Sequence, residues 1–118
     1  MGGVYSEVEY QKEGKKHDSG KLRYDLVPVD AQREVVRVLT FGAQKYGDNN
    51  WRITEPKSRY IAAAFRHIEA FRSGETVDAE SGIHPLAHAI CSLLFVLQMQ
   101  VEKPNSNAIL GVNEDGNA

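Results

Sequence analysis

Three stretches of the chain repeat apolar residues at intervals of three or four positions, and this period constrains the fold more than any other feature. The stretches cover residues 30–47, 56–74 and 85–104. Such a spacing is typical of an amphipathic helix, whereas a half-buried strand alternates apolar and polar residues. No stretch of the sequence alternates in that way and no segment repeats, so the sequence predicts an all-α fold.

Residues that commonly start or end helices lie at the boundaries of these stretches. Asp30 is suited to cap the first helix and Gly47 to end it. Pro85 suits the first position of the third helix, because its missing N–H would have no partner there. The apolar positions expected to form the core are Val35, Leu39, Ala43 and Tyr46 in the first helix, Ile61, Ala64, Phe65, Ile68 and Phe71 in the second, and Leu86, Ile90, Leu93, Leu94, Leu97 and Val101 in the third.

The predicted helices occupy one domain, residues 30–104, with a segment on either side. Residues 1–29 are polar and lack a sustained period, and we interpret them as an extended N-terminal arm. Residues 105–118 are rich in Asn and Gly and are expected to be mobile or to dock on a partner. Because three helices make a thin core, we expect the helical bundle to be completed by oligomerisation.

Charge and cysteine content exclude several classes of protein. The formal net charge is -2, so the chain lacks the basic excess of a general nucleic-acid-binding protein. A single cysteine, Cys91, excludes an intrachain disulfide and suits a reducing cytoplasm. Residues 1–10 do not resemble a secretory signal, and the apolar stretch 87–101 is too interrupted for a membrane span. We expect a cytoplasmic protein that binds neither nucleic acid nor membrane, and whose polyanionic ligand is small.

Potential metal ligands are concentrated between the second and third helices. Three of the four histidines lie between residues 67 and 88, around the densest acidic run, residues 75–83, which we call the acidic loop. Residues four apart on a helix share a face, so His84 and His88 could present their rings to one point. Oxygen donors with few imidazoles suit Mg²⁺ or Mn²⁺ better than zinc. The candidate ligands are His67, Glu69, Glu75, Asp78, Glu80, His84 and His88.

A second group of candidate residues follows the first helix. Trp51 offers a face on which a base could stack, while Lys45 and Arg52 could neutralise phosphates. The ordinary alternative is a helix end whose Trp51 anchors the loop on the core. Likewise, the acidic loop could simply be solvated, and Glu69 could pair with Arg66 or Arg72 on the surface.

Several motifs then occur in a specific order: Gly20–Pro28, Lys45–Gly47 with Asn50–Arg52, Arg66–Ala70 leading to Gly74–Glu75, and Asp78–His88. Over roughly residues 17 to 100 this order resembles the phage dATP/dGTP diphosphohydrolase family, whose best-known members are called MazZ. These are similar to the MazG-type all-α nucleotide pyrophosphohydrolases. The resemblance implies a MazG-like helical bundle and a homo-oligomer, dimer or tetramer, in which helices from two chains complete each bundle.

The resemblance also implies an activity. Such enzymes cleave a purine deoxynucleoside triphosphate, dGTP or dATP, to the monophosphate and pyrophosphate with Mg²⁺ or Mn²⁺. In phages that replace adenine with 2-aminoadenine, MazZ-like enzymes hydrolyse dGTP to supply dGMP. MazG-type enzymes bind metal through an E-E-x-x-E helix and a later E-x-x-D helix, and neither helical pattern occurs here; Glu75–Asp78 spells E-x-x-D only in a Gly-flanked loop.

On this hypothesis, the acidic and histidine cluster holds the metal, which lowers the pKa of the attacking water. Glu69 or Glu75 takes the proton from that water, and Asn50 and Trp51 contact the purine. Cations then stabilise charge on the leaving pyrophosphate. The cations and purine contacts together give the candidate substrate-binding residues Lys21, Arg23, Lys45, Asn50, Trp51, Arg52 and Arg66.

Two alternatives remain open. One is an HD-type phosphohydrolase with His67, Asp78, His84 and His88 around a metal, although the only His-Asp dipeptide, His17–Asp18, lies in the polar arm. The other is a non-enzymatic helical module that binds a nucleotide or a partner.

Overall fold

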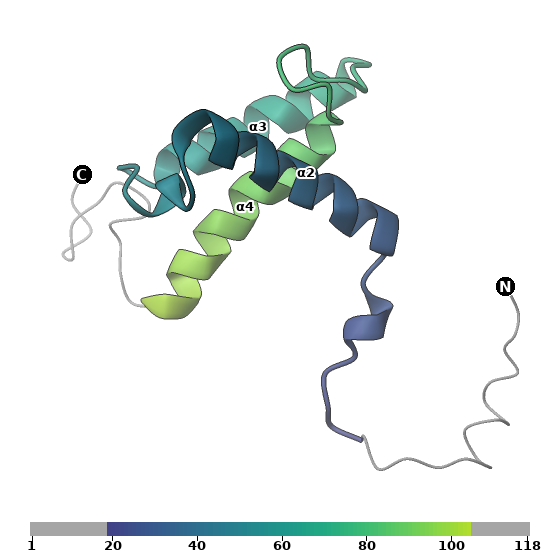
Figure 1. Ribbon diagram of the computed structural model, residues 1–118, viewed down its shortest axis with the longest axis vertical. Coiled ribbons are helices and arrows are strands. Elements are labelled where there is room, and N and C mark those ends of the chain that lie inside the picture. Colours follow the sequence, from purple (N-terminus) through teal and green to yellow (C-terminus); the bar gives the residue numbers. More distant parts are fainter. Residues whose placement is uncertain (1–18, 105–118) are drawn as a thin grey trace, which may run out of the picture.

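The computed structural model describes residues 19–104, and these residues form three α-helices without strands (Figure 1). The helices are α2 (Val29–Tyr46), α3 (Ser58–Arg72) and α4 (Pro85–Glu102). Two 3-10 turns, η1 (Tyr24–Leu26) and η2 (Asn50–Arg52), flank α2. Helix α3 packs against α4, and α2 lies across α4. The predicted all-α fold is confirmed.

Both ends of α2 follow from local sequence. The helix begins at Val29, after Pro28, so Asp30 lies in its first turn and is not the cap that we predicted. A carboxylate in the first turn still interacts favourably with the helix dipole. Gly47 ends the helix as predicted, with a φ of 100° that a residue with a Cβ rarely adopts.

Helix α4 begins at Pro85, as predicted, and His84 caps it. The backbone of His84 is not helical, and its Nδ1 accepts a hydrogen bond of 3.0 Å from the Leu86 N–H. The His84 ring lies against Phe71, with 5.3 Å between ring centroids. Because His84 precedes the helix, it does not form the helical i, i+4 pair with His88 that the spacing allowed.

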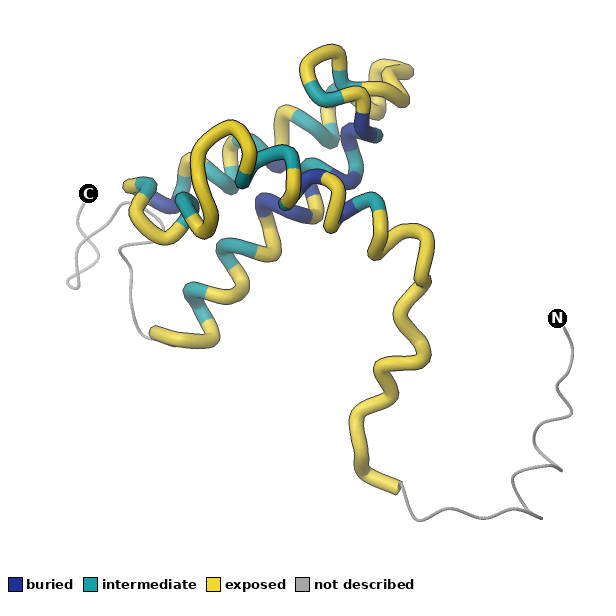
Figure 2. The backbone as a smooth tube through the Cα atoms, viewed as in Figure 1, coloured by how far each residue is buried: buried dark blue, intermediate teal, exposed yellow. Residues whose placement is uncertain are grey.

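The buried core of the chain is small and is formed largely by small side chains. Figure 2 shows it where the helices cross. The side chains of Ala64 on α3 and Ala89 on α4 are only 2% and 3% exposed. Such side chains let two helix backbones approach closely. The main buried cluster consists of Val35, Val38, Ile83, Ala87 and Cys91.

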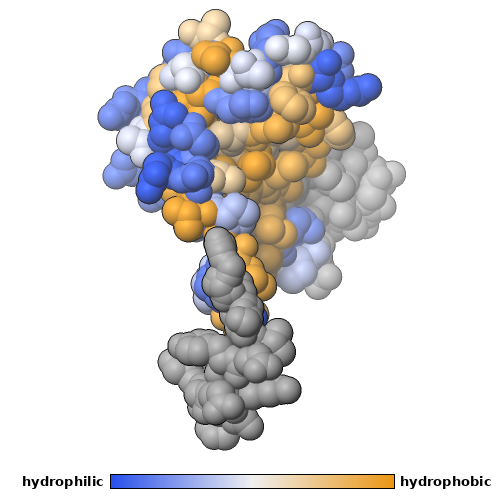
Figure 3. Space-filling model, turned by 90° about the vertical axis from the view of Figure 1, so that its right-hand side faces the viewer, coloured by the Kyte–Doolittle hydropathy of each residue, from blue (hydrophilic) through white to orange (hydrophobic). Residues whose placement is uncertain are grey.

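The large apolar side chains predicted for the core of α4 face outward instead. Leu97 is 59% exposed and Val101 68% exposed, and Phe65 on α3 is 67% exposed. Ile90, Leu93 and Leu94 are each exposed by more than two fifths. The prediction of which α4 face is buried is therefore wrong for the single chain, since periodicity identifies an apolar face but not its partner. The face of the molecule drawn in Figure 3 carries a continuous group of apolar side chains.

By length and composition alone, α4 could cross a membrane, unlike our expectation from the interrupted stretch 87–101. The expectation counted uninterrupted apolar residues, whereas the whole 18-residue helix is apolar on average. The core helix of a soluble protein passes the same test, and α4 packs on both other helices.

Residues 19–28 lead away from the helices and are exposed throughout (Figures 1 and 2). Within this segment Arg23 donates two hydrogen bonds of 2.8 Å to the Asp25 carboxylate. The rest of the predicted arm, residues 1–18, and the predicted tail, residues 105–118, lie outside the described residues.

Candidate functional site

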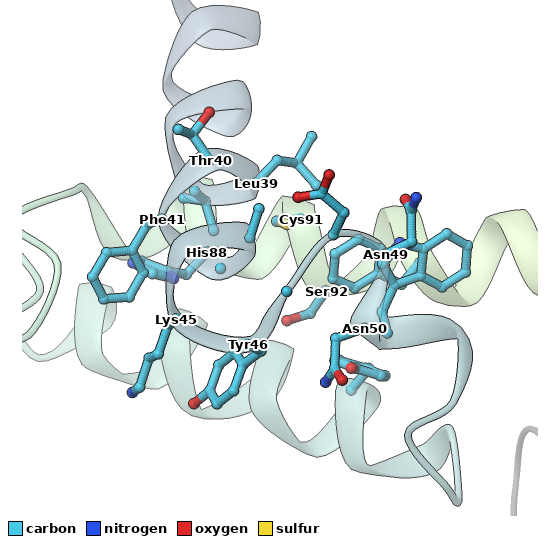
Figure 4. Close-up of a pocket in the computed structure, with 18 of the residues that line it drawn as sticks. Leu39, Thr40, Phe41, Lys45, Tyr46, Asn49, Asn50, His88, Cys91 and Ser92 are labelled. Carbon is cyan, nitrogen blue, oxygen red and sulfur yellow. The ribbon is translucent and has the colours of Figure 1, made fainter.

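A cleft of about 620 Å³ opens between the second half of α2, the loop that follows it and the facing side of α4 (Figure 4). This volume is in the range of pockets that bind small molecules. The cleft unites two groups of residues that lie apart in the sequence. Its wall includes Lys45, Tyr46, Asn49, Asn50 and Trp51 from the end of α2 and its loop, and His67, Asp78, Glu80 and His88 from α3, the acidic loop and α4.

Two histidines stack on each other in this wall. The ring centroids of His67 and His88 are 4.7 Å apart, with 22° between the ring planes. Burial lowers the pKa of His67 below its usual value, and the positive charge that His88 would carry lowers it further. Burial also lowers the pKa of His88, although Asp78 and Glu80 oppose the shift. Both imidazoles are therefore neutral near pH 7 and can accept a proton.

A chain of hydrogen bonds fixes the His88 ring. The Ser81 hydroxyl donates to Asp78 Oδ2 over 3.1 Å, and Ser81 Oγ lies 2.6 Å from His88 Nε2. Because a carboxylate only accepts hydrogen bonds, the hydroxyl proton is directed to Asp78, and Nε2 must carry the proton that His88 donates to Ser81. The Ile83 N–H also donates to Ser81 Oγ, over 3.2 Å. This leaves the lone pair of neutral His88 on Nδ1.

The charge of Asp78 is held by the acidic loop itself. Burial alone would raise the pKa of Asp78, but the Ser81 N–H and hydroxyl, together with His88 and the Glu80 N–H, lower it overall. The Asp78 backbone also closes the loop, because its N–H donates to the Ile83 carbonyl over 2.9 Å. Asp78 therefore stays ionised and anchors Ser81 and His88.

Lys45 and Glu80 bridge the cleft from opposite walls. The Lys45 ammonium forms an ion pair with Glu80 and lies over the Tyr46 ring, 5.0 Å from its centroid. Hydrogen bonding to Glu80, and then to Tyr46, raises the pKa of Lys45. Both charged side chains are exposed, so a phosphate that enters the cleft can compete with Glu80 for Lys45.

The Trp51 ring anchors its loop. It stacks on Phe95 of α4, with 4.9 Å between centroids and 7° between planes, and the Arg52 guanidinium lies 4.4 Å from the Trp51 centroid. The anchoring role that we gave as the alternative is thus present. Trp51 nevertheless also contributes to the cleft wall.

The remaining candidate residues lie outside the cleft wall. Arg52 pairs with Glu102 at the far end of α4, over 3.2 Å. Arg66 and Glu69 are exposed on α3, and Glu75 is exposed in the acidic loop. His84 is the cap of α4. Lys21 and Arg23 lie in the exposed segment that leads away from the helices.

The seven residues that we expected to bind a metal therefore do not lie together: four of them line the cleft and three lie outside its wall. Over residues 19–104, no three His, Cys, Asp or Glu side chains are close enough together to hold a metal ion. Asp78 and Glu80 already bind Ser81 and Lys45. The described donors of a single chain thus do not by themselves supply the several oxygen ligands that a Mg²⁺ or Mn²⁺ centre needs.

Two residues with clear roles had no signal in the sequence. Ser81 joins Asp78 to His88, and the buried Lys57 binds the loop that contains Trp51. A single serine in an acidic loop and a single lysine before a helix are both typical of solvated surfaces. Only their tertiary contacts distinguish them.

Comparison with known proteins agrees with the order of motifs in the sequence. Residues 11–108 match the family described as dATP/dGTP diphosphohydrolase, N-terminal. A protein of Salmonella phage PMBT28 named dATP/dGTP diphosphohydrolase is 35% identical over 107 residues, which cover 86% of this chain and 37% of that protein. The chain thus spans little more than a third of that relative. No solved structure matches it. On the extent of the family match, this chain belongs to the dATP/dGTP diphosphohydrolase family and corresponds to its N-terminal domain.

Proposed function

We propose that the cleft binds a purine deoxynucleoside triphosphate, dGTP or dATP, and that the chain hydrolyses it to the monophosphate and pyrophosphate. This proposal rests on one observation: a loop lined by Asn and aromatic residues, two neutral histidines and Lys45 all surround one cavity. The name of the Salmonella phage relative supports the substrate class. A dGMP product would also fit the supply of a precursor for 2-aminoadenine DNA, in the host cytoplasm if the chain is phage-encoded.

The chemistry of the cleft wall suggests how a nucleotide would lie. The base would contact the edges of Tyr46 and Trp51, with the amides of Asn49 and Asn50 as hydrogen-bonding partners. The triphosphate would then lie toward Lys45, whose ammonium would exchange Glu80 for a phosphate oxygen. That exchange places a positive charge where charge develops on the leaving pyrophosphate.

In our proposal His88 takes the role that the sequence suggested for Glu69 or Glu75. A water oxygen attacks the α-phosphorus, the bond from that phosphorus to the α–β bridging oxygen breaks, and pyrophosphate leaves. The proton from the water goes to His88 Nδ1, the open lone pair of the ring. Ser81 and Asp78 hold the ring and stabilise the imidazolium that forms.

The resemblance implies a divalent metal, and Mg²⁺ or Mn²⁺ remains our proposed cofactor. Since the described side chains do not assemble a three-donor set, the steps above use no metal. When bound, such an ion would screen the charge of the triphosphate.

We also propose that a second copy of the chain covers the exposed apolar face of α4. A monomer rarely leaves a long, continuous apolar helix face in water. Sedimentation analysis should give a dimer or tetramer for the native chain and a monomer for Leu94→Arg. A native chain that sediments as a monomer at all concentrations would refute this assembly.

The experiment that tests the function is product analysis with dGTP, dATP, dCTP and dTTP, each with Mg²⁺, Mn²⁺ or a chelator. We expect monophosphate and pyrophosphate from the purine substrates. Replacing the proposed base, His88→Gln, should slow turnover by about 10²–10⁴-fold, the usual contribution of general base catalysis. Orthophosphate as the product would contradict the proposed bond cleavage. If Glu69→Gln abolishes turnover and His88→Gln does not, the base is misassigned.

A nucleotide-binding module is the second candidate. It is favoured by the absence of a three-donor set over residues 19–104. It predicts dGTP binding without turnover and without dependence on metal. The HD-type alternative has less support, because His84 caps α4 and does not line the cleft.

A further inference from the structure

Lys57 is the one charged residue that is buried in the described part of the protein. It is only 2% exposed, although lysine normally keeps its ammonium group in water. Burying an ammonium is costly unless every donor finds a partner. The contacts of the Lys57 ammonium must therefore offset the cost of its burial.

The contacts of Lys57 match the three donors of an ammonium group. Its Nζ donates to the carbonyl oxygens of Trp51, over 2.7 Å, and Arg52, over 3.0 Å, and also to the carbonyl of Thr54. The Glu55 carboxylate lies 3.4 Å from Nζ. One cation thus binds three backbone carbonyls of a single loop.

The position of Lys57 does not favour α3. Lys57 precedes Ser58, the first residue of that helix, where a positive charge opposes the helix dipole. The benefit of the ammonium must come from the loop between α2 and α3. That loop has little helical backbone to pair its carbonyls, and buried carbonyls without donors destabilise a structure.

The same loop forms part of the cleft wall. Trp51 and Asn50 both line the cleft, and Trp51 stacks on Phe95. The Thr54 hydroxyl donates to the Asn50 carbonyl over 3.2 Å, which links the Lys57-bound part of the loop to Asn50. Moving the Trp51 or Thr54 backbone would therefore move the residues that face the base.

We propose that Lys57 is a positioning residue for the nucleotide site: its buried ammonium holds the loop of residues 50–54 in the conformation that presents Asn50 and Trp51 to the cleft. The proposal rests on the proposed function for its consequence in binding. Its structural half stands apart from that function, because Trp51 is the only tryptophan and reports directly on the loop.

The test uses Lys57→Ala and Lys57→Met, with Lys103→Met as the control at an exposed lysine. Far-UV circular dichroism measures the helices, and Trp51 fluorescence and near-UV circular dichroism measure the loop. We expect both Lys57 variants to keep their helical signal and to lose the near-UV signal of the stacked Trp51. The control should retain both. Wild-type Trp51 signals in both Lys57 variants would overturn the proposal.

Binding of the α,β-methylene analogue of dGTP and steady-state kinetics test the functional half. We expect Kd and KM to rise roughly tenfold or more with little change in kcat, since misplaced positioning groups weaken binding of substrate and transition state alike. A fall in kcat with unchanged KM would contradict a positioning role. If the wild-type chain neither binds nor hydrolyses dGTP, the proposed function fails while the Trp51 signals still decide whether Lys57 holds the loop.

Chemical rescue distinguishes an effect of Lys57 on the loop of residues 50–54 from an effect on the whole fold. Lys57→Ala leaves space beside the three carbonyls, so ethylammonium should restore the Trp51 signal and the nucleotide affinity. It should not do so in Lys57→Met, whose side chain fills that space. Loss of helical signal in both variants, with no restoration by ethylammonium in Lys57→Ala, would show that Lys57 supports the whole fold and would overturn the proposal.

Discussion

Replacing Ser81 with alanine removes the group that joins Asp78 to His88. Ser81 Oγ is 2.6 Å from His88 Nε2, 3.1 Å from Asp78 Oδ2 and 3.2 Å from the Ile83 nitrogen. A neutral hydrogen bond contributes about 0.5–1.5 kcal/mol to stability and one to a charged group about 1.5–3 kcal/mol. The expected destabilisation is smaller than the sum of the three hydrogen-bond contributions, because Ser81 is only half-buried and water replaces part of the lost hydrogen bonding. We therefore expect Ser81→Ala to lower the free energy of unfolding by about 2 kcal/mol.

Urea unfolding monitored by circular dichroism measures this loss. The matched control is Ser73→Ala, at an exposed serine just after α3, where a surface substitution should change stability by less than about 0.5 kcal/mol. Nitrogen-15 NMR of the histidines supplies a second measurement: His88 should be protonated on Nε2 in the native chain and mixed between tautomers in Ser81→Ala. Equal unfolding midpoints for the two variants, or native His88 protonated on Nδ1, would refute the assigned hydrogen-bond chain.

Three further predictions concern packing, pH and thiol chemistry. Ala64→Leu should overpack the contact of α3 with α4 and cost about 1–3 kcal/mol, whereas Ala62→Leu on the exposed face should be nearly neutral in the same urea assay. Because burial lowers the pKa of His67 and His88 below about 6.5, the unfolded chain binds more protons than the folded chain near that pH. The free energy of unfolding should therefore change little between about pH 7.5 and 8, before Cys91 ionises in the unfolded chain, and should fall as the pH drops through 6.5. Unfolding midpoints between pH 8 and pH 5 that do not change would contradict this. Burial raises the pKa of Cys91 from 9.0 to about 11, so Cys91 should react with a disulfide reagent at pH 8 roughly 100-fold more slowly than a free thiol, and an equal rate would show that it is accessible.

The fold was predictable to the extent that it depends on local period. Apolar spacing and the residues Gly47 and Pro85 located all three helices, because a helix end and an amphipathic face are properties of nearby sequence. The buried face of α4 was not predictable. Leu97 and Ala89 are both apolar, and only the geometry of the neighbouring helices decides that Ala89 is buried and Leu97 exposed.

The candidate site, like the fold, was only partly predictable from the sequence. His67, His88 and Lys45 could be singled out because their side chains have few roles other than chemistry or charge, and all three line the cleft. His84 was grouped with them by spacing, but its place before the first turn of α4 makes it a cap. Ser81 could not be found, since its role comes entirely from the loop that brings it to His88.

We propose that a nucleotide binds in the cleft beside α2 and α4. NMR titration of the native chain with the α,β-methylene analogue of dGTP tests it most directly, because the indole N–H of Trp51 and the ring signals of His67 and His88 come from three parts of one wall. We expect all three residues to shift together with a single dissociation constant. Shifts confined to Arg23 and the exposed segment around it, or no saturable shift at all, would show that the nucleotide does not bind in this cleft.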